Sequence, residues 1–144
     1  MASTRGKVNL KDLEHFKEKL ERLSTAQRSQ FSNAAIKELA ARLLAKTIKR
    51  TPVGTYPKRT GKKGGVLRRG WTIGNVKRAG GTITIEIYNP VEYATYVEFG
   101  HRTPDHTGWV DGRFMLTISE QEIQKDAPRI LKNRLDAFVR SVFE

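Results

Sequence analysis

The chain of 144 residues contains no cysteine, so neither a disulfide nor a thiolate-bound zinc ion can stabilise it. It also contains no apolar run approaching the roughly 18–20 residues that a membrane span needs. The opening residues Met1–Arg5 are not followed by an apolar segment, as they would be in a secretory signal. We therefore expect a soluble protein without a membrane partner, and the length suits a single domain over residues 1–144.

Acidic residues are missing from the middle of the chain, since none lies between Glu38 and Glu86. The same window holds twelve basic residues, which matches the net charge of +12 of the whole chain. The excess positive charge therefore belongs to this one stretch and not to the surface in general. Its basic residues are Arg42, Lys46, Lys49, Arg50, Lys58, Arg59, Lys62, Lys63, Arg68, Arg69, Lys77 and Arg78.

Groups suited to catalysis are scarce. The three histidines are His15, His101 and His106, of which the last two flank Asp105 closely enough to suggest a metal site. A polar loop explains that trio better, because short motifs of this kind match by chance. The glycine-rich segment 61–65 resembles a phosphate-binding loop but lacks the preceding strand and the Gly-Lys-Ser/Thr ending. We predict no enzyme activity, no catalytic residue, no bound metal and no cofactor.

Apolar periodicity predicts helices at both ends of the chain. Leucines and Phe16 recur at three- and four-residue steps over residues 10–23, and a second helix is predicted from Ser24 to about Lys49. Ser24 and Gln27 form a possible capping box at its start, and Pro52 ends it. Its apolar positions are Phe31, Ala35, Ile36, Leu39, Leu43, Leu44 and Ile48.

The C-terminal helix has two possible starts. Residues 119–122 form a second possible capping box, and Asp126 before Ala127 and Pro128 is a favourable N-cap with proline in the first turn. The apolar face of this helix is expected to contain Ile130, Leu131, Leu135, Phe138, Val139 and Val142.

Strand patterns occupy the centre of the chain, after a turn-rich basic loop over residues 53–65 that we expect to be mobile. Residues 71–76 suggest a strand with a bulge at Gly74. Residues 79–81 supply a turn, and Thr82–Tyr88 alternates strictly with its three isoleucines on one face. The two strands should form an antiparallel hairpin.

Residues 93–100 fit a short helix that ends at Gly100 in a left-handed conformation, although Thr95–Phe99 also fits a strand. Trp109 and Val110 suggest one further short strand after a polar, turn-rich segment. We expect residues 1–9 to be flexible. The order of helices, strands and helices predicts the α+β fold class. A small antiparallel sheet packs with N-terminal and C-terminal helices, and a long basic loop joins the two halves.

The basic stretch has three interpretations. It can be an assembly arm that becomes ordered against an acidic neighbour, a segment that contacts nucleic-acid phosphates through residues 46–69, or a solvated loop. We favour the assembly arm, because no helix-turn-helix, zinc-finger or RNA-binding pattern accompanies the charge. The arm residues are Lys49, Arg50, Lys58, Arg59, Lys62, Lys63, Arg68 and Arg69.

Glu98 stands apart from these charges. It lies between Val97 and Phe99, and it could pair with Arg102 or with an arginine of the basic stretch. A solvated glutamate fits the pattern equally well.

Two motifs carry a resemblance to a known family. Thr51-Pro52-Val53, the basic loop and Gly65-Val66-Leu67-Arg68-Arg69-Gly70-Trp71 form the first, and residues 89–101, with the run Tyr-Ala-Thr-Tyr-Val-Glu-Phe-Gly, form the second. The chain resembles the tail-completion, or minor tail, proteins of long-tailed bacteriophages and prophages. Its dense set of lysines between Pro52 and Leu67 departs from their commonest pattern. The positions that match are Pro52, Leu67, Tyr93, Ala94, Val97, Glu98, Gly100 and Met115, with structural roles.

This resemblance implies a structural protein of the virion neck that is assembled in the bacterial host cytoplasm. Such proteins complete the tail, join it to the filled head and act as a ring of identical copies. The expected partners are further copies of the chain and other neck or tail proteins, and non-specific contact with DNA in the channel is compatible with this role.

Overall fold

The computed structural model describes residues 10–143, so the expected flexible segment 1–9 lies outside the described residues. The elements follow one another as α1 (Leu10–Glu21), α2 (Thr25–Arg50), the 3₁₀ turn η1 (Lys58–Thr60), α3 (Val66–Gly70), β1 (Thr72–Ile73), β2 (Lys77–Ala79), β3 (Thr82–Thr84), β4 (Ile87–Tyr88), α4 (Ala94–Phe99), β5 (Gly100–Arg102), β6 (Trp109–Asp111) and α5 (Met115–Phe143). This order confirms the α+β class, with helices at both ends and short antiparallel strands between them.

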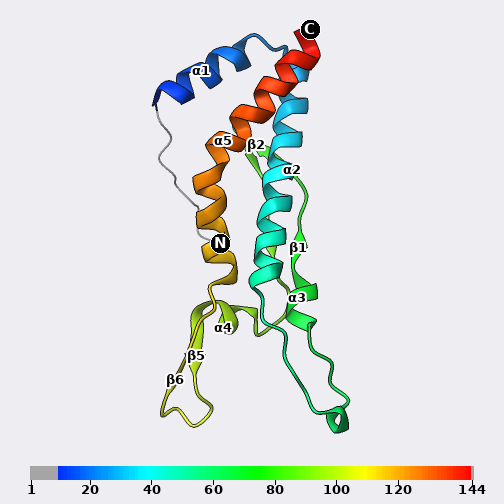
Figure 1. Ribbon diagram of the computed structural model, residues 1–144, viewed down its shortest axis with the longest axis vertical. Helices are drawn as coiled ribbons and strands as arrows, with labels where there is room; N and C mark the ends of the chain where they lie inside the picture. Colours follow the sequence, from blue (N-terminus) through cyan, green and yellow to red (C-terminus); the bar gives the residue numbers. More distant parts are fainter. Residues whose placement is uncertain (1–9, 144) are drawn as a thin grey trace.

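Two long helices, α2 and α5, run side by side in opposite directions and form the body of the molecule (Figure 1). Ser24 begins α2 with the predicted capping box, because its side chain and that of Gln27 each accept a backbone N–H of the other. Apolar side chains from both helices meet toward one end of the pair, around Phe31 and Leu135. The cluster contains Leu23, Phe31, Ala35 and Leu135, with Leu131, Phe138 and Val139 packed against it.

Ion pairs accompany this apolar contact along the two helices. Glu122 of α5 binds both Lys46 and Arg50 of α2, and Glu38 of α2 binds Arg134 of α5 with N–O 2.5 Å. Helix α1 is joined to α5 by an ion pair between Lys19 and Asp136. These side chains are partly exposed, so each pair contributes only about 0–1 kcal/mol, and burial of apolar surface is the larger stabilising contribution.

The predicted starts of the C-terminal helix at Ser119 and Asp126 are both wrong. Helix α5 begins at Met115 and continues through Pro128 to Phe143. Ser119 is fully buried within it and donates its hydroxyl to the Met115 carbonyl at 2.6 Å. Pro128 cannot donate a backbone N–H, but residues on both sides of it, Ile123 and Ile130, are buried. Tertiary packing on both sides of the proline therefore outweighs the lost hydrogen bond.

The central hairpin forms as predicted but is interrupted. β1 pairs with β4 and β2 pairs with β3, both antiparallel, and between them the Gly74 N–H donates to the Glu86 carbonyl at 2.8 Å. Gly80 and Gly81, both with positive φ, make the turn. The isoleucines at 83, 85 and 87 share the more buried face, as the alternation predicts. The hairpin packs against α2, and Arg78 binds the Ser29 carbonyl and the Asn33 side chain.

The segment after the hairpin contains helix α4, so the alternative of a strand at residues 95–99 is wrong. Gly100 has φ 89° and ψ 172°, which is a positive φ but not the expected left-handed helical cap. A second hairpin follows, in which β5 pairs with β6; the strand at Trp109 was predicted and its partner at Gly100–Arg102 was not. No helix within residues 10–143 is both long and apolar enough to cross a bilayer.

Candidate functional site

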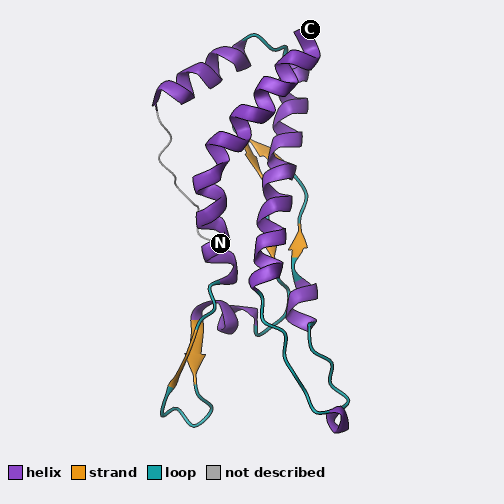
Figure 2. Ribbon diagram, in the orientation of Figure 1, coloured by secondary structure: helices purple, strands orange, loops and turns teal. Residues whose placement is uncertain are grey.

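One end of the helix pair carries two projecting segments (Figure 2). The first is the basic loop, residues 53–65, which leaves the end of α2 and returns into α3. The second is the aromatic hairpin, defined here as β5, β6 and their connecting turn, which lies between α4 and the start of α5. The two segments diverge from a common base. This end of the molecule contains the predicted arm residues and the positions that match the family.

Thr51 anchors the point at which the basic loop leaves α2. Its side chain is fully buried, donates to the Thr47 carbonyl at 2.7 Å and accepts the indole N–H of Trp71 at 2.7 Å. Its carbonyl accepts two hydrogen bonds from the guanidinium of Arg68, at 3.1 and 2.6 Å. The Thr-Pro element therefore joins the end of α2 to α3, while Pro52 itself is exposed.

The two limbs of the basic loop touch near its base. A Cβ atom at Gly64 would lie 1.9 Å from the Gly54 carbonyl oxygen, so only glycine permits this approach. Beyond it, Lys62 lies over the ring of Tyr56 with its amine 5.8 Å from the ring centre. The tip is completely exposed. Since no acidic residue occurs in residues 39–85, the loop itself contains nothing to neutralise Lys58, Arg59, Lys62 and Lys63.

The structure divides the eight predicted arm residues into two groups. Arg50 binds Glu122 and the Ser119 hydroxyl, Arg68 caps the end of α2, and Arg69 donates to the Gly64 carbonyl at 3.3 Å. These three arginines hold the base of the loop in place. Of the eight, the residues that face solvent without a described ion pair or hydrogen bond to the body are Lys49, Lys58, Arg59, Lys62 and Lys63.

Several of the positions that match the family converge on one small core beneath the projecting segments. Leu67 from α3, Ala94 from α4 and Met115 from α5 are buried together, although they are far apart in the chain. Val97 packs against this cluster, as do Trp71 and Val91. Tyr93 lies outside it and is exposed.

Glu98 has a role that neither sequence interpretation included. It is only 6% exposed, and its carboxylate accepts the backbone N–H of Leu116 at 3.0 Å and of Thr117 at 2.8 Å. The Thr117 hydroxyl donates to it as well, at 2.8 Å. Glu98 therefore caps the N-terminus of α5 from α4. Both sequence alternatives, pairing with Arg102 or an arginine of the basic stretch and a solvated glutamate, are wrong. A carboxylate at this position also complements the positive end of the helix dipole.

Two glycines let the end of α4 cross the start of α5 at close range. A Cβ atom at Gly112 would lie 2.4 Å from the Glu98 carbonyl oxygen, and one at Gly100 would lie 2.5 Å from the Val110 carbonyl oxygen. Backbone bonds from Arg113 to Val97 and from Phe114 to Glu98 fix the crossing at 2.7 and 3.0 Å. The base of the aromatic hairpin is consequently held against α4 by main-chain contacts.

Large aromatic side chains lie exposed around this crossing, and the sequence did not reveal them. Tyr96, Phe99 and Trp109 are 59%, 58% and 59% exposed. Phe99 contacts the half-exposed Phe114 edge-to-face, with ring centres 6.4 Å apart. Phe114 has φ 47°, an unfavourable backbone conformation for a bulky residue. We call Tyr96, Phe99, Trp109 and Phe114 the aromatic patch.

The histidines do not form a metal site in the described part of the chain. The Nδ1 of His101 lies 2.7 Å from the backbone carbonyl oxygen of Arg102, which can only accept a hydrogen bond, and the imidazole packs edge-to-face against the ring of Tyr96. Asp105 instead orders the hairpin turn, since hydrogen bonds from Thr103 and Thr107 lower its pKa to about 2. Within residues 10–143, no three potential ligands lie close enough together to hold a metal ion.

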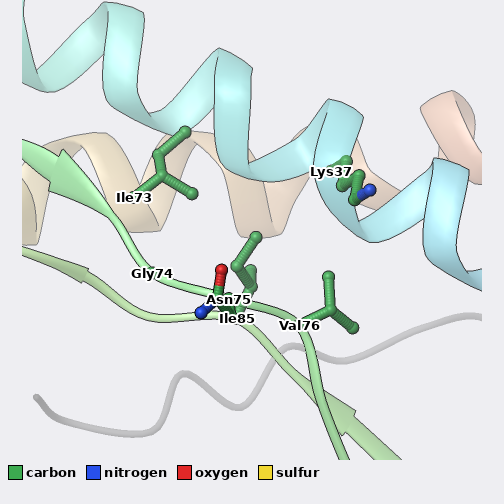
Figure 3. Close-up of a pocket in the computed structure, with 6 residues that line it drawn as sticks. All are labelled: Lys37, Ile73, Gly74, Asn75, Val76 and Ile85. Carbon is green, nitrogen blue, oxygen red and sulfur yellow. The ribbon is translucent and has the colours of Figure 1, made fainter.

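A shallow hollow lies between α2 and the central hairpin, away from both projecting segments (Figure 3). Its walls are Lys37, Ile73, Gly74, Asn75, Val76 and Ile85. This lining is mostly apolar and contains no carboxylate, histidine or hydroxyl that could act as an acid, base or nucleophile. The hollow therefore does not have the chemistry of an active site.

Comparison with known proteins gives one family. The model of the family described as "Bacteriophage HK97-gp10, putative tail-component" matches residues 14–100, which run from α1 through the central hairpin and α4 to the first residue of β5. No curated protein and no solved structure matches the chain. Because the match covers more than half of the chain and includes the basic loop, Leu67 and the Tyr93–Gly100 motif, the chain belongs to the HK97-gp10-like family of phage tail components.

Proposed function

We propose that this protein is a structural component of the phage or prophage neck, which acts in tail completion and head–tail joining as a ring of identical copies. The observation that carries the proposal is the family match together with two segments projecting from one end of a rigid helix pair. A ring subunit needs surfaces that reach its neighbours, and exposed segments on a stable base provide them. Assembly would take place in the host cytoplasm and the mature protein would reside in the virion.

The distribution of buried and exposed side chains at the projecting end supports an assembly role over a catalytic one. Leu67, Ala94, Met115 and Glu98 are buried and use their side chains to build the base. The exposed residues at this end include Arg59 and the aromatic rings of Tyr96, Phe99 and Trp109, and arginine and aromatic residues are enriched at binding interfaces. The proposal therefore includes no enzyme activity and no cofactor.

Particle assembly tests this proposal directly. A phage or prophage that lacks the gene should produce DNA-filled heads and separate tails when lysates are viewed by electron microscopy, and supplying the wild-type chain should restore joined particles. Normal, infectious virions in the absence of the protein would contradict the neck role.

Contact between the basic loop and DNA is a second candidate function. Lys58, Arg59, Lys62 and Lys63 are exposed and have no carboxylate within the loop, so they are available to phosphates. Lys46, Arg50 and Arg68 are engaged within the protein, so the surface available to DNA is narrower than residues 46–69.

A salt titration of binding to duplex DNA tests this second function. Four or five phosphate contacts predict a slope of log K against log salt of about −4. Replacing the four loop cations with alanine should reduce the slope to near zero, whereas unchanged binding would place the DNA contact elsewhere.

A further inference from the structure

We infer that the basic loop of one copy binds the aromatic patch of the next copy, so that the ring is closed by a head-to-tail contact between these two segments. This inference rests on the proposed ring and names the surfaces that form it. The occupant of the aromatic patch is a second copy of this chain.

The aromatic patch requires a partner. Tyr96, Phe99 and Trp109 are more than half exposed, and Phe99 contacts the ring of Phe114. The four side chains lie on α4, on β6 and at the start of α5. Exposed clusters of this kind mark interaction sites, and aromatic residues dominate the energetics of interfaces. The unfavourable φ of Phe114 keeps an apolar ring at the surface, where it does not contribute to the core.

The patch is also rigid before any partner binds. Gly100 and Gly112 allow main-chain contact at its base, and Glu98 fixes the start of α5 beneath it. A preorganised surface loses little conformational entropy on binding, which leaves more of the contact energy as affinity.

The basic loop has the complementary chemistry. Cations bind the faces of aromatic rings, and the loop already shows this preference internally, because Lys62 lies over Tyr56. Lys58, Arg59 and Lys63 have no such partner in the described structure. Asp111, an exposed carboxylate on the same strand as Trp109, gives the loop cations an ionic contact beside the rings.

Geometry excludes pairing within one copy in this conformation. The basic loop and the aromatic hairpin leave the same end of the helix pair and diverge (Figure 1). The loop of one molecule and the patch of another are different surfaces, so their contact is heterologous and repeats around a ring until it closes.

Self-association measured by sedimentation tests the pairing with two variants. The loop variant replaces Lys58, Arg59, Lys62 and Lys63 with alanine, and the patch variant combines Phe99→Ala with Tyr96→Ala. All six side chains are exposed, so the fold should survive, which circular dichroism verifies. Each variant alone should associate at least about tenfold more weakly than wild type.

A mixture of the two variants gives the sharpest outcome. The loop variant retains an intact patch and the patch variant retains an intact loop, so the mixture should form 1:1 heterodimers and nothing larger. An absence of heterodimers, or undiminished association of the loop variant, would overturn the pairing. Association that is unchanged while binding to duplex DNA is lost would assign the loop to DNA and also overturn it.

Cysteine crosslinking locates the contact independently, because the chain has no native cysteine. A chain carrying both Thr60→Cys in the basic loop and Thr95→Cys beside the aromatic patch should give a ladder of covalent oligomers with a short bismaleimide, whereas an equal mixture of the two single variants should stop at dimers. The same Thr95→Cys change paired with Lys125→Cys, on the exposed side of α5, is the control and should give no ladder.

Failure of this inference is distinct from failure of the neck role. Wild-type oligomers without the expected crosslinks would overturn the loop–patch contact only. The neck role depends on whether particles lacking the protein still join heads to tails.

Discussion

Replacing Glu98 should destabilise the protein strongly, because its carboxylate caps a helix to which it does not belong. Glu98→Ala removes three hydrogen bonds, two of them to backbone N–H groups of Leu116 and Thr117 at the start of α5. Loss of a side-chain cap costs about 0.5–2 kcal/mol, and each buried donor left without a partner adds about 1–3 kcal/mol before water compensates. We expect the free energy of unfolding to fall by about 3 kcal/mol.

Glu98→Gln removes the negative charge of the capping side chain but keeps its size, so it separates the contribution of the charge from that of the side-chain packing. With its amide oxygen at the Oε1 position, the glutamine keeps both hydrogen bonds from Thr117, but its NH₂ group faces the backbone N–H of Leu116, so that third hydrogen bond is lost. It also removes the negative charge that complements the helix dipole. The expected loss is about 1–2 kcal/mol, between wild type and the alanine variant.

Urea denaturation followed by circular dichroism at neutral pH measures both effects. For a chain of this length a loss of 3 kcal/mol corresponds to a fall of about 10 °C in melting temperature. Glu92→Ala is the matched control, since Glu92 is an exposed glutamate of the same segment and should change stability by less than about 0.5 kcal/mol. If Glu98→Ala were as stable as the Glu92 control, the capping role would be refuted.

Three further changes test other parts of the structure. Thr51→Val leaves the indole N–H of Trp71 without its acceptor and should lower the free energy of unfolding by about 1–3 kcal/mol, measured by urea denaturation. Pro128→Ala restores a backbone donor inside α5 and should raise the melting temperature. Glu122→Gln should lower the urea midpoint above pH 4.5 but not near pH 2, because hydrogen bonds from Arg50 and then Lys46 lower the Glu122 pKa from 4.5 to about 2 in the folded state.

Each of these changes has its own control and contrary result. Thr55→Val alters an exposed threonine of the basic loop and should be neutral, so equal losses at both threonines would contradict the anchoring role of Thr51. A Pro128→Ala variant that melts earlier than wild type would mean that the ring of Pro128 packs favourably. For Glu122 the stabilising contribution is present above the unfolded pKa and disappears as pH falls through the folded pKa, so a difference that persists at pH 2 would contradict the ion-pair origin.

Glu120 provides a contrast within the same helix. Burial raises its pKa above 4.5, and the charge of Glu98 raises it further. A group with a raised folded pKa favours the folded state below the unfolded pKa and opposes it as pH rises. Glu120→Gln should therefore raise the urea midpoint at neutral pH relative to wild type, with the difference vanishing below about pH 4.

The parts of the fold that the sequence predicts correctly are those that local chemistry decides. The start of α2 follows from Ser24 and Gln27, whose side chains cap their own helix. The register of the central hairpin follows from the alternating isoleucines, because one face of the strand must be buried. In both cases the interacting residues are neighbours in the chain.

The errors arise where a distant partner decides the outcome. Ser119 has the sequence pattern of a cap, but contact between α5 and α2 extends the helix past it and buries it. Glu98 acts on residues 18 and 19 positions further along the chain, and no local pattern indicates that separation. Gly100 and Gly112 indicate that two backbone segments approach closely, but the sequence does not identify the end of α4 and the start of α5 as those segments.

The aromatic patch was missed for a different reason. Residues 93–100 are predicted to form a short helix, and the helical spacing alone does not show which of its apolar side chains face a core. The core at this end is already filled by Leu67, Ala94 and Met115, which leaves the larger rings outside. An apolar side chain in a short helix can pack into the core or contact a partner. Which of the two occurs depends on which other side chains fill the core.

The same small core sets the geometry of both projecting segments. Leu67 lies two residues after the basic loop, and Met115 lies four residues after the end of β6. Burying them together therefore fixes the distance between the bases of the two segments. In a head-to-tail ring the angle between successive subunits depends on where each subunit places its two contact surfaces. In the proposed ring, Leu67, Ala94 and Met115 would therefore set the angle between subunits from buried positions beneath the contact surfaces. The proposed ring therefore leaves the composition of the exposed tips free to vary with the partner, while the spacing between the tips depends on buried residues.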